Sequence, residues 1–113
     1  MSLADMTTDQ IRTMPPSREM DRLVAVALGW HDYHEPSLPH YSSRHAAALE
    51  ALERYAETAH IDKISKAMNT DYRGWTVAVT KNDNMRTADG PDGLPGLALA
   101  ICRAILLAEK GTP

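Results

Sequence analysis

The sequence predicts a small α+β domain, and two periodic patterns carry this prediction. Apolar residues recur at helical spacing over residues 17–28, 43–59 and 97–109. Between the last two segments, residues 74–80 alternate apolar and polar side chains and are rich in valine and threonine, as half-buried strands are. A length of 113 residues fits one domain and leaves no room for a second.

Composition excludes several classes of protein. Hydrophobic residues make up 43% and charged residues 24% of the chain, as in ordinary soluble domains and unlike disordered ones. The net charge of −3 argues against a DNA- or RNA-binding surface, which would be basic. No apolar run approaches the roughly 20 residues of a membrane span, so no membrane is expected as a partner. The single cysteine, Cys102, excludes an internal disulfide and a multi-cysteine zinc site.

Residues 1–16 are expected to be a flexible lead-in, and residues 17–113 to form one domain. The lead-in has no sustained apolar period, and the two prolines at its end disfavour helix directly before them. It also lacks a basic region followed by an apolar stretch, so it does not read as a secretory signal. We therefore expect a cytoplasmic protein.

Serines precede each of the first two expected helices. Ser17 is the expected N-cap of the helix over residues 17–28, and Ser42 or Ser43 that of the helix over residues 43–59, because serine side chains accept hydrogen bonds from the first free amides of a helix. The prolines between the two helices predict a loop there.

The second half of the chain predicts a strand, a turn and a buried helix. Residues 60–72 fit either a helix or a short edge strand. After strand 74–80, residues 81–84 (Lys-Asn-Asp-Asn) have the composition of a turn, and residues 90–96 are a flexible, glycine-rich approach to the last helix. That helix, over residues 97–109, is apolar on nearly all sides and must be covered on several of them. A domain of this size can hardly do that alone, so we expect self-association through this helix.

Arg103 is the most informative candidate for a binding role. It is the only charged residue between Gly93 and Glu109 and lies in the middle of the apolar helix. A guanidinium left buried and unpaired would cost several kcal/mol, so it needs a partner. Its planar fork suits a phosphate or carboxylate of a ligand. The alternatives are a salt bridge within the chain or a side chain that reaches the surface.

Four further residues are candidates for recognition of a nucleotide. Trp75, at the start of the strand, is either core or a platform on which a base stacks. Asn82, Asn84 and Arg86 are either ordinary turn residues or polar groups that read a base edge. The glycine-rich residues 90–96 could bind an anion through backbone N–H groups, but they match no established phosphate-binding pattern.

The residues that usually carry catalysis are poorly arranged. The histidines of His31-Asp-Tyr-His34-Glu35 do not have the spacing of a helical zinc site. Cys102 lies in the apolar helix, where a thiol is usually inert. There is no Gly-x-Ser-x-Gly elbow. We therefore expect no catalytic residue, no metal and no cofactor.

Three segments, with Gly74-Trp75-Thr76-Val77 between the last two, resemble the small phage and prophage proteins of the phage ABA-sandwich domain family. The resemblance covers about residues 18–109. The segments read Ala27-Leu28-Gly29-Trp30 at the end of the first helix, Pro39-His40-Tyr41-Ser42-Ser43 before the second, and Ala100-Ile101-Cys102-Arg103-Ala104 in the last. The family is similar to the type 1 Thoeris anti-defence proteins of phages, which are sponges. Such sponges bind cyclic ADP-ribose isomers made by bacterial TIR-domain immune enzymes without cleaving them, and some sequester cyclic oligonucleotides.

The resemblance implies an antiparallel sheet flanked by helices, an α-β-α sandwich, with ligand pockets at a subunit interface. It implies that Arg103 grips the nucleotide, that Trp75 stacks on adenine, and that Asn84 supplies a polar contact. The chain departs from the family over residues 60–72, where a clear strand is usual.

These observations predict a phage anti-defence protein that sequesters a cyclic nucleotide immune signal in the cytoplasm of the infected host. A cyclic ADP-ribose isomer or a cyclic dinucleotide is the expected ligand, and a dimer or hexamer the expected assembly. The alternative is a structural or regulatory phage protein that dimerises and has no nucleotide ligand.

Overall fold

The computed structural model describes residues 3–30, 37–64 and 74–111. Within them the α+β class is confirmed, because a three-stranded antiparallel sheet in the order β1-β2-β3 packs with four α-helices. In chain order the elements are the 3₁₀ helix η1 (Leu3–Asp5), α1 (Thr8–Thr13), α2 (Arg18–Ala27), α3 (His45–Tyr55), β1 (Thr58–Ile64), β2 (Gly74–Lys81), β3 (Asn84–Pro91) and α4 (Leu94–Lys110).

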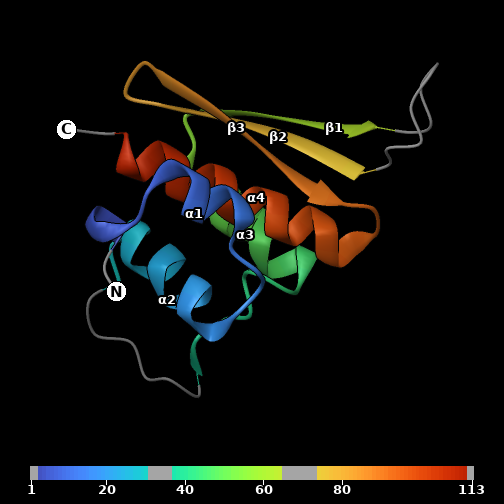
Figure 1. Cartoon of the computed structure of the whole chain (residues 1–113), viewed down its shortest axis with the longest axis horizontal. Coiled ribbons are helices and arrows are strands. Elements are labelled where there is room, and N and C mark those ends of the chain that lie inside the picture. The colour runs from blue at the N-terminus through green and yellow to red at the C-terminus, as the bar shows by residue number, and fades with distance from the viewer. Residues whose placement is uncertain (1–2, 31–36, 65–73, 112–113) are drawn as a thin grey trace.

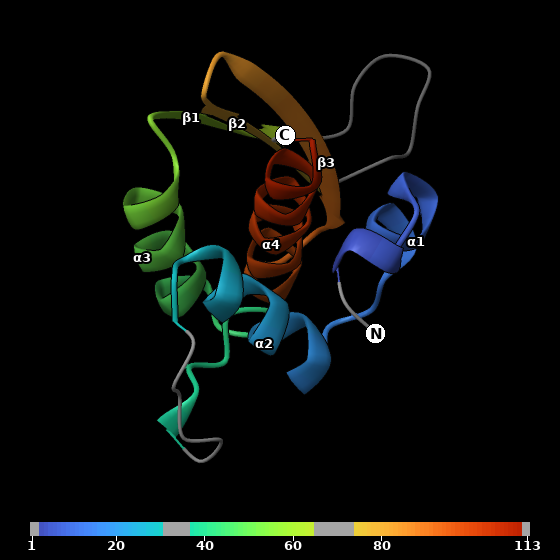
Figure 2. The same cartoon turned by 90° about the vertical axis from the view of Figure 1, so that its left-hand side faces the viewer.

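The described helices all lie on the same side of the sheet (Figure 1). α4 runs directly beneath the strands, with α3 on one flank, α1 on the other and α2 on the side away from the sheet (Figure 2). Val77 and Val79 of β2 face α4 and are fully buried. The opposite face of the sheet carries polar contacts, such as the hydrogen bond from Thr76 Oγ1 to Asp89 Oδ1 at 2.9 Å.

A single chain covers the apolar last helix. From Leu97 to Ala108 every residue of α4 except Arg103 is buried. Strands β2 and β3 cover one side of the helix, and α1, α2 and α3 cover the others. The reason for expecting self-association through α4 is therefore wrong, whereas the oligomeric state stays a prediction. No described helix is both long and apolar enough to cross a membrane.

The expectation of a flexible lead-in over residues 1–16 is also wrong for its described part. Thr7 and Gln10 form a reciprocal capping box that starts α1. Ile11 is fully buried and Met14 is 8% exposed, both within the core. The prolines restrict only the residues directly before them, and α1 ends at Thr13, early enough to avoid that restriction.

The serine caps were half right. Ser17 is the N-cap of α2, since its hydroxyl accepts from the Met20 amide at 3.1 Å. The second helix is shorter than the expected 43–59, and its N-cap is Arg44, with no side-chain cap. Ser42 is unavailable because its amide and hydroxyl bind residues of the preceding helix. At the other end, the Glu57 amide donates to Thr80 O at 3.0 Å, so the chain has already turned toward the sheet.

The described part of residues 60–72 is an edge strand, β1, and residues 65–73 lie outside the described residues. The turn predicted at residues 81–84 joins β2 to β3. Asn82 and Asp83 have positive φ values of 54° and 62°, as the two-residue hairpin requires.

The glycines before α4 permit a close approach of strand and helix. A Cβ on Gly90 would lie 2.0 Å from the carbonyl oxygen of Gly96, and one on Gly96 would lie 1.6 Å from that of Pro91. Only glycine fits both positions, so β3 and the first turn of α4 pack backbone to backbone. Pro95 stands in the first turn of α4, where proline costs no hydrogen bond.

Candidate functional site: a pocket between α2 and α3

The predicted nucleotide-binding residues do not come together in one place. Trp75 stands at the start of β2, and Asn82 lies in the turn after the other end of that strand. Seven residues of strand separate them, which is about 23 Å. Asn84 and Arg86 share the end with Asn82. One small ligand cannot contact both groups on the same chain.

Trp75 and its neighbours are engaged within the chain. The Trp75 indole N–H donates to Gly93 O at 2.8 Å, which fixes the ring against the start of α4. The Lys63 ammonium lies 5.4 Å from the ring centroid, within the range of a cation–π contact. Trp75 therefore joins the sheet to the first turn of α4.

Asn84 and Arg86 lie at the opposite end of α4. A Cβ on Gly111 would lie 2.7 Å from Asn84 Nδ2 and 3.0 Å from Arg86 Nη2, so both side chains border that residue. Arg86 Nη1 donates to Met85 O at 2.9 Å. The amide nitrogen of Asn84 is buried and has no hydrogen-bond partner among the described residues.

Arg103 is satisfied by backbone carbonyl groups of its own chain. Its Nη2 and Nε donate to Met14 O at 2.9 and 3.3 Å, and its Nη1 donates to Asp89 O at 2.9 Å. These bonds tie the segment after α1 and strand β3 to the middle of α4. The prediction that this cation needs partners is correct, but these partners are neither a ligand nor a carboxylate.

Arg103 shares this role with Arg12, whose Nη1 donates to Thr87 O at 3.0 Å. Lys81 and Asn84 close the two-residue turn as a hydrogen-bonded pair, so the carbonyls of Thr87 and Asp89 point away from β2. The two guanidinium groups thus cap successive carbonyls on the free edge of β3. Edge strands that are covered in this way are protected from pairing with another chain.

A pocket forms where two of the segments that carry the family resemblance meet. It has a volume of about 110 Å³ and lies between the end of α2 and the face of α3. Its lining residues are Leu28, Trp30, Pro39, Tyr41, Ala47, Glu50, Ala51 and Arg54. The two aromatic residues come from the Leu-Gly-Trp and His-Tyr-Ser-Ser motifs, so the motifs themselves were the signal for this site.

The pocket has an apolar interior and a charged rim. Tyr41 is 4% exposed, whereas the side chains of Arg54 and Glu50 are 55% and 64% exposed and form an ion pair of 2.9 Å. Burial raises the pKa of the Tyr41 hydroxyl, the nearby Arg54 cation opposes that rise, and Glu50 adds to it. Tyr41 therefore stays protonated at neutral pH and can donate a hydrogen bond.

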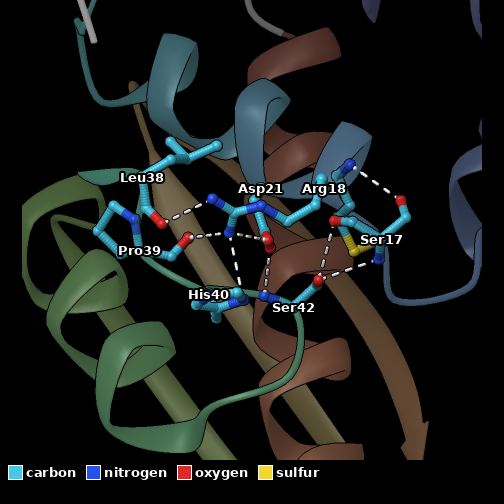
Figure 3. Close-up of polar contacts among 8 residues, drawn as sticks. Ser17, Arg18, Asp21, Leu38, Pro39, His40 and Ser42 are labelled. Carbon is cyan, nitrogen blue, oxygen red and sulfur yellow. Dashed lines mark hydrogen bonds and ion pairs between the residues drawn. The ribbon is translucent and has the colours of Figure 1, made fainter. Parts of the chain in front are cut away.

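A buried carboxylate holds the loop that forms the wall of the pocket (Figure 3). Asp21, which is 1% exposed, accepts from the Ser42 amide at 2.8 Å and from Arg18 Nη1 at 2.9 Å. Arg18 Nη2 donates to Leu38 O at 2.9 Å. The Ser42 hydroxyl accepts from the Ser17 amide and donates to Ser17 O, both at 3.1 Å.

This network resembles a catalytic triad only in composition. His40 Nδ1 lies 3.2 Å from Arg18 Nη1, and the Ser42 hydroxyl donates to a backbone carbonyl. A general base must lie within hydrogen-bond reach of the nucleophile it activates, and the geometry gives Ser42 a different acceptor. The network positions residues 38–42 against α2.

Other chemistry-bearing residues add no site. Cys102 is fully buried, and burial raises the pKa of its thiol well above the usual range, which keeps it protonated. Among the described residues no three His, Cys, Asp or Glu side chains gather to hold a metal ion. The His31-to-Glu35 motif lies outside the described residues.

No family model, no curated protein and no solved structure matches this chain. The resemblance to the phage ABA-sandwich family therefore stays a prediction that rests on the three segments alone.

Proposed function

We propose that this chain is a binding protein that sequesters a nucleotide-type signal in the pocket between α2 and α3 and does not cleave it. The observation that carries the proposal is the pairing of an aromatic, largely buried interior with an arginine at the rim. Trp30 and Tyr41 line the interior, and the Arg54 guanidinium stands at the opening.

The chemistry of the lining fits such a ligand. Stacking of a base on an aromatic side chain contributes about 1–3 kcal/mol. The guanidinium of Arg54 can form two parallel hydrogen bonds to a phosphate. A volume of about 110 Å³ is small beside the roughly 300–1,000 Å³ of pockets that enclose whole ligands. We therefore place one ring of the ligand in the pocket and its phosphates outside, against Arg54.

This proposal moves the site away from the residues expected from the sequence. Arg103 and Trp75 already donate to carbonyl groups of their own chain. Arg54 takes the phosphate-binding role in their place, and Trp30 takes the stacking role. The biological role inferred from the family resemblance stays a proposal: an anti-defence protein that holds a cyclic ADP-ribose isomer or a cyclic oligonucleotide in the cytoplasm of an infected bacterium.

Calorimetric titration with cyclic ADP-ribose isomers and cyclic dinucleotides tests the proposal. Arg54→Gln should weaken binding by about ten- to a hundredfold, the value of one charge-assisted hydrogen bond. Trp30→Ala should weaken it by a similar factor. Arg44→Gln is the matched control, because this exposed arginine at the start of α3 does not line the pocket. Absence of heat and of thermal stabilisation with every compound refutes the proposal. Ligand recovered intact after heat denaturation separates a sponge from a hydrolase.

The alternative function, a dimerising structural or regulatory protein without a nucleotide ligand, is favoured by Arg103. Its guanidinium is used inside the chain, so no external anion is needed to explain it. A chain that associates with itself and gives no heat with any of these compounds supports this alternative.

A further inference from the structure

The two edges of the sheet are treated differently. On β3, guanidinium groups of Arg12 and Arg103 occupy the outward carbonyls of Thr87 and Asp89. On the opposite side of the sheet, β1 is the other edge strand (Figure 2). An edge strand presents a row of unpaired N–H and C=O groups that can pair with another chain.

The register shows which groups of β1 are free. On β2, Lys81 and every second residue before it bond to β3, so the residues between them bond to β1. The bond from the Glu57 amide to Thr80 O agrees with this alternation. Ala59, Ile61 and Lys63 of β1 therefore point their backbone groups away from the sheet. No hydrogen bond joins these groups to another described residue.

β1 carries none of the usual obstacles to pairing. It contains no proline, and its seven consecutive pairs with β2 leave no bulge. Lysine on an edge strand often discourages pairing, but the Lys63 ammonium lies over the Trp75 ring and so points along the sheet. The residues from Thr58 to His60 and from Asp62 to Lys63 are exposed.

A two-fold axis through Ile61 makes β1 complementary to itself. With Ile61 opposite Ile61 of a second copy, Ala59 lies opposite Lys63, and all three outward residues pair by hydrogen bonds. His60 then lies opposite Asp62 of the other strand, twice per dimer, in the closely spaced type of pair. A shift of the axis by one residue would instead oppose His60 to His60 or Asp62 to Asp62, so charge selects the first register.

We propose that the occupant of this edge is a second copy of the chain, joined through antiparallel pairing of β1 with β1 to give one continuous six-stranded sheet. This inference is independent of the pocket and of any ligand. It replaces the apolar helix α4 with a strand edge as the surface of self-association.

Sedimentation equilibrium over a range of concentrations tests the pairing. The wild-type mass should rise from 12.5 kDa to twice that value. His60→Asp places carboxylates opposite each other and should raise the dissociation constant about tenfold, or about 1.4 kcal/mol. The double exchange of His60→Asp with Asp62→His restores opposite partners and should recover the wild-type constant. Ala59→Pro removes an outward N–H, which a monomer tolerates at an edge, and should weaken pairing at least as much.

Thr87→Asp on β3 is the matched control, because it adds a charge to the sheet on its other edge and should leave the dissociation constant unchanged. Circular dichroism and thermal unfolding establish that each variant folds. A wild type that stays monomeric at all concentrations overturns the proposal. So does a double exchange that is no better than His60→Asp alone, or an effect of Thr87→Asp as large as that of His60→Asp.

Discussion

The buried carboxylate of Asp21 gives the sharpest test of how the pocket wall is held. Asp21→Ala removes the acceptor of the Ser42 amide, and a buried amide without an acceptor costs about 1–3 kcal/mol. It also removes the ion pair with Arg18. That side chain is 34% exposed and keeps its bond to Leu38 O, so we assign this loss only about 1 kcal/mol. The free energy of unfolding should therefore fall by about 3 kcal/mol.

Asp21→Asn separates the two contributions. It keeps a carbonyl oxygen for the Ser42 amide and loses only the charge, so it should cost about 1 kcal/mol. Urea unfolding followed by tryptophan fluorescence measures both values, and the melting temperature should fall by about 12 °C for alanine and 4 °C for asparagine. Glu53→Ala, an exposed carboxylate on α3, is the control and should change little. Equal losses for alanine and asparagine, or a loss below about 1 kcal/mol for alanine, would refute this account of the network.

Two further predictions follow from buried groups of α4. Arg103→Met leaves the carbonyls of Met14 and Asp89 without their donors and uncovers the edge of β3, so it should cost about 2 kcal/mol in urea and increase light scattering on heating; unchanged values for both would contradict the edge-capping role. The raised pKa of Cys102 means that its thiol is protonated in both states below about pH 8.5, ionises first in the unfolded chain above it, and so favours unfolding as the pH rises. Cys102→Ala should lessen the loss of stability between about pH 8.5 and pH 10, and a loss equal to that of the wild type would contradict it.

The periodic elements were predictable because their apolar residues repeat with the period of the structure. α2, α4 and β2 each place one side against the core and differ from the expected ranges by a few residues at most. β3 was not predicted, because the side of that strand which faces α4 carries Asn84, Arg86, Ala88 and Gly90. Close packing on the helix demands small residues there, so the usual alternation of large apolar residues is absent.

The candidate site was only partly predictable for the same reason. A lone arginine among apolar residues correctly indicated a need for partners, but its partners are carbonyls of an edge strand that had no apolar signature. The pocket residues Trp30 and Tyr41 were visible as parts of a motif, yet only the folded loop brings them to one cavity. Asp21 gave no signal at all, because a carboxylate in the first turn of a helix usually faces water.

The tight contact between β3 and α4 explains where the molecule has surface left for function. Gly90 and Gly96 let the strand lie directly on the helix, and the arginines then cover the outer edge of that strand. With β2 and three other helices around it, α4 is complete within one chain. The features left open lie before and after α3, which borders the pocket through Ala47, Glu50, Ala51 and Arg54 and leads directly into β1. Binding of a ligand and pairing of two chains therefore draw on separate surfaces of the fold, and neither requires the apolar helix.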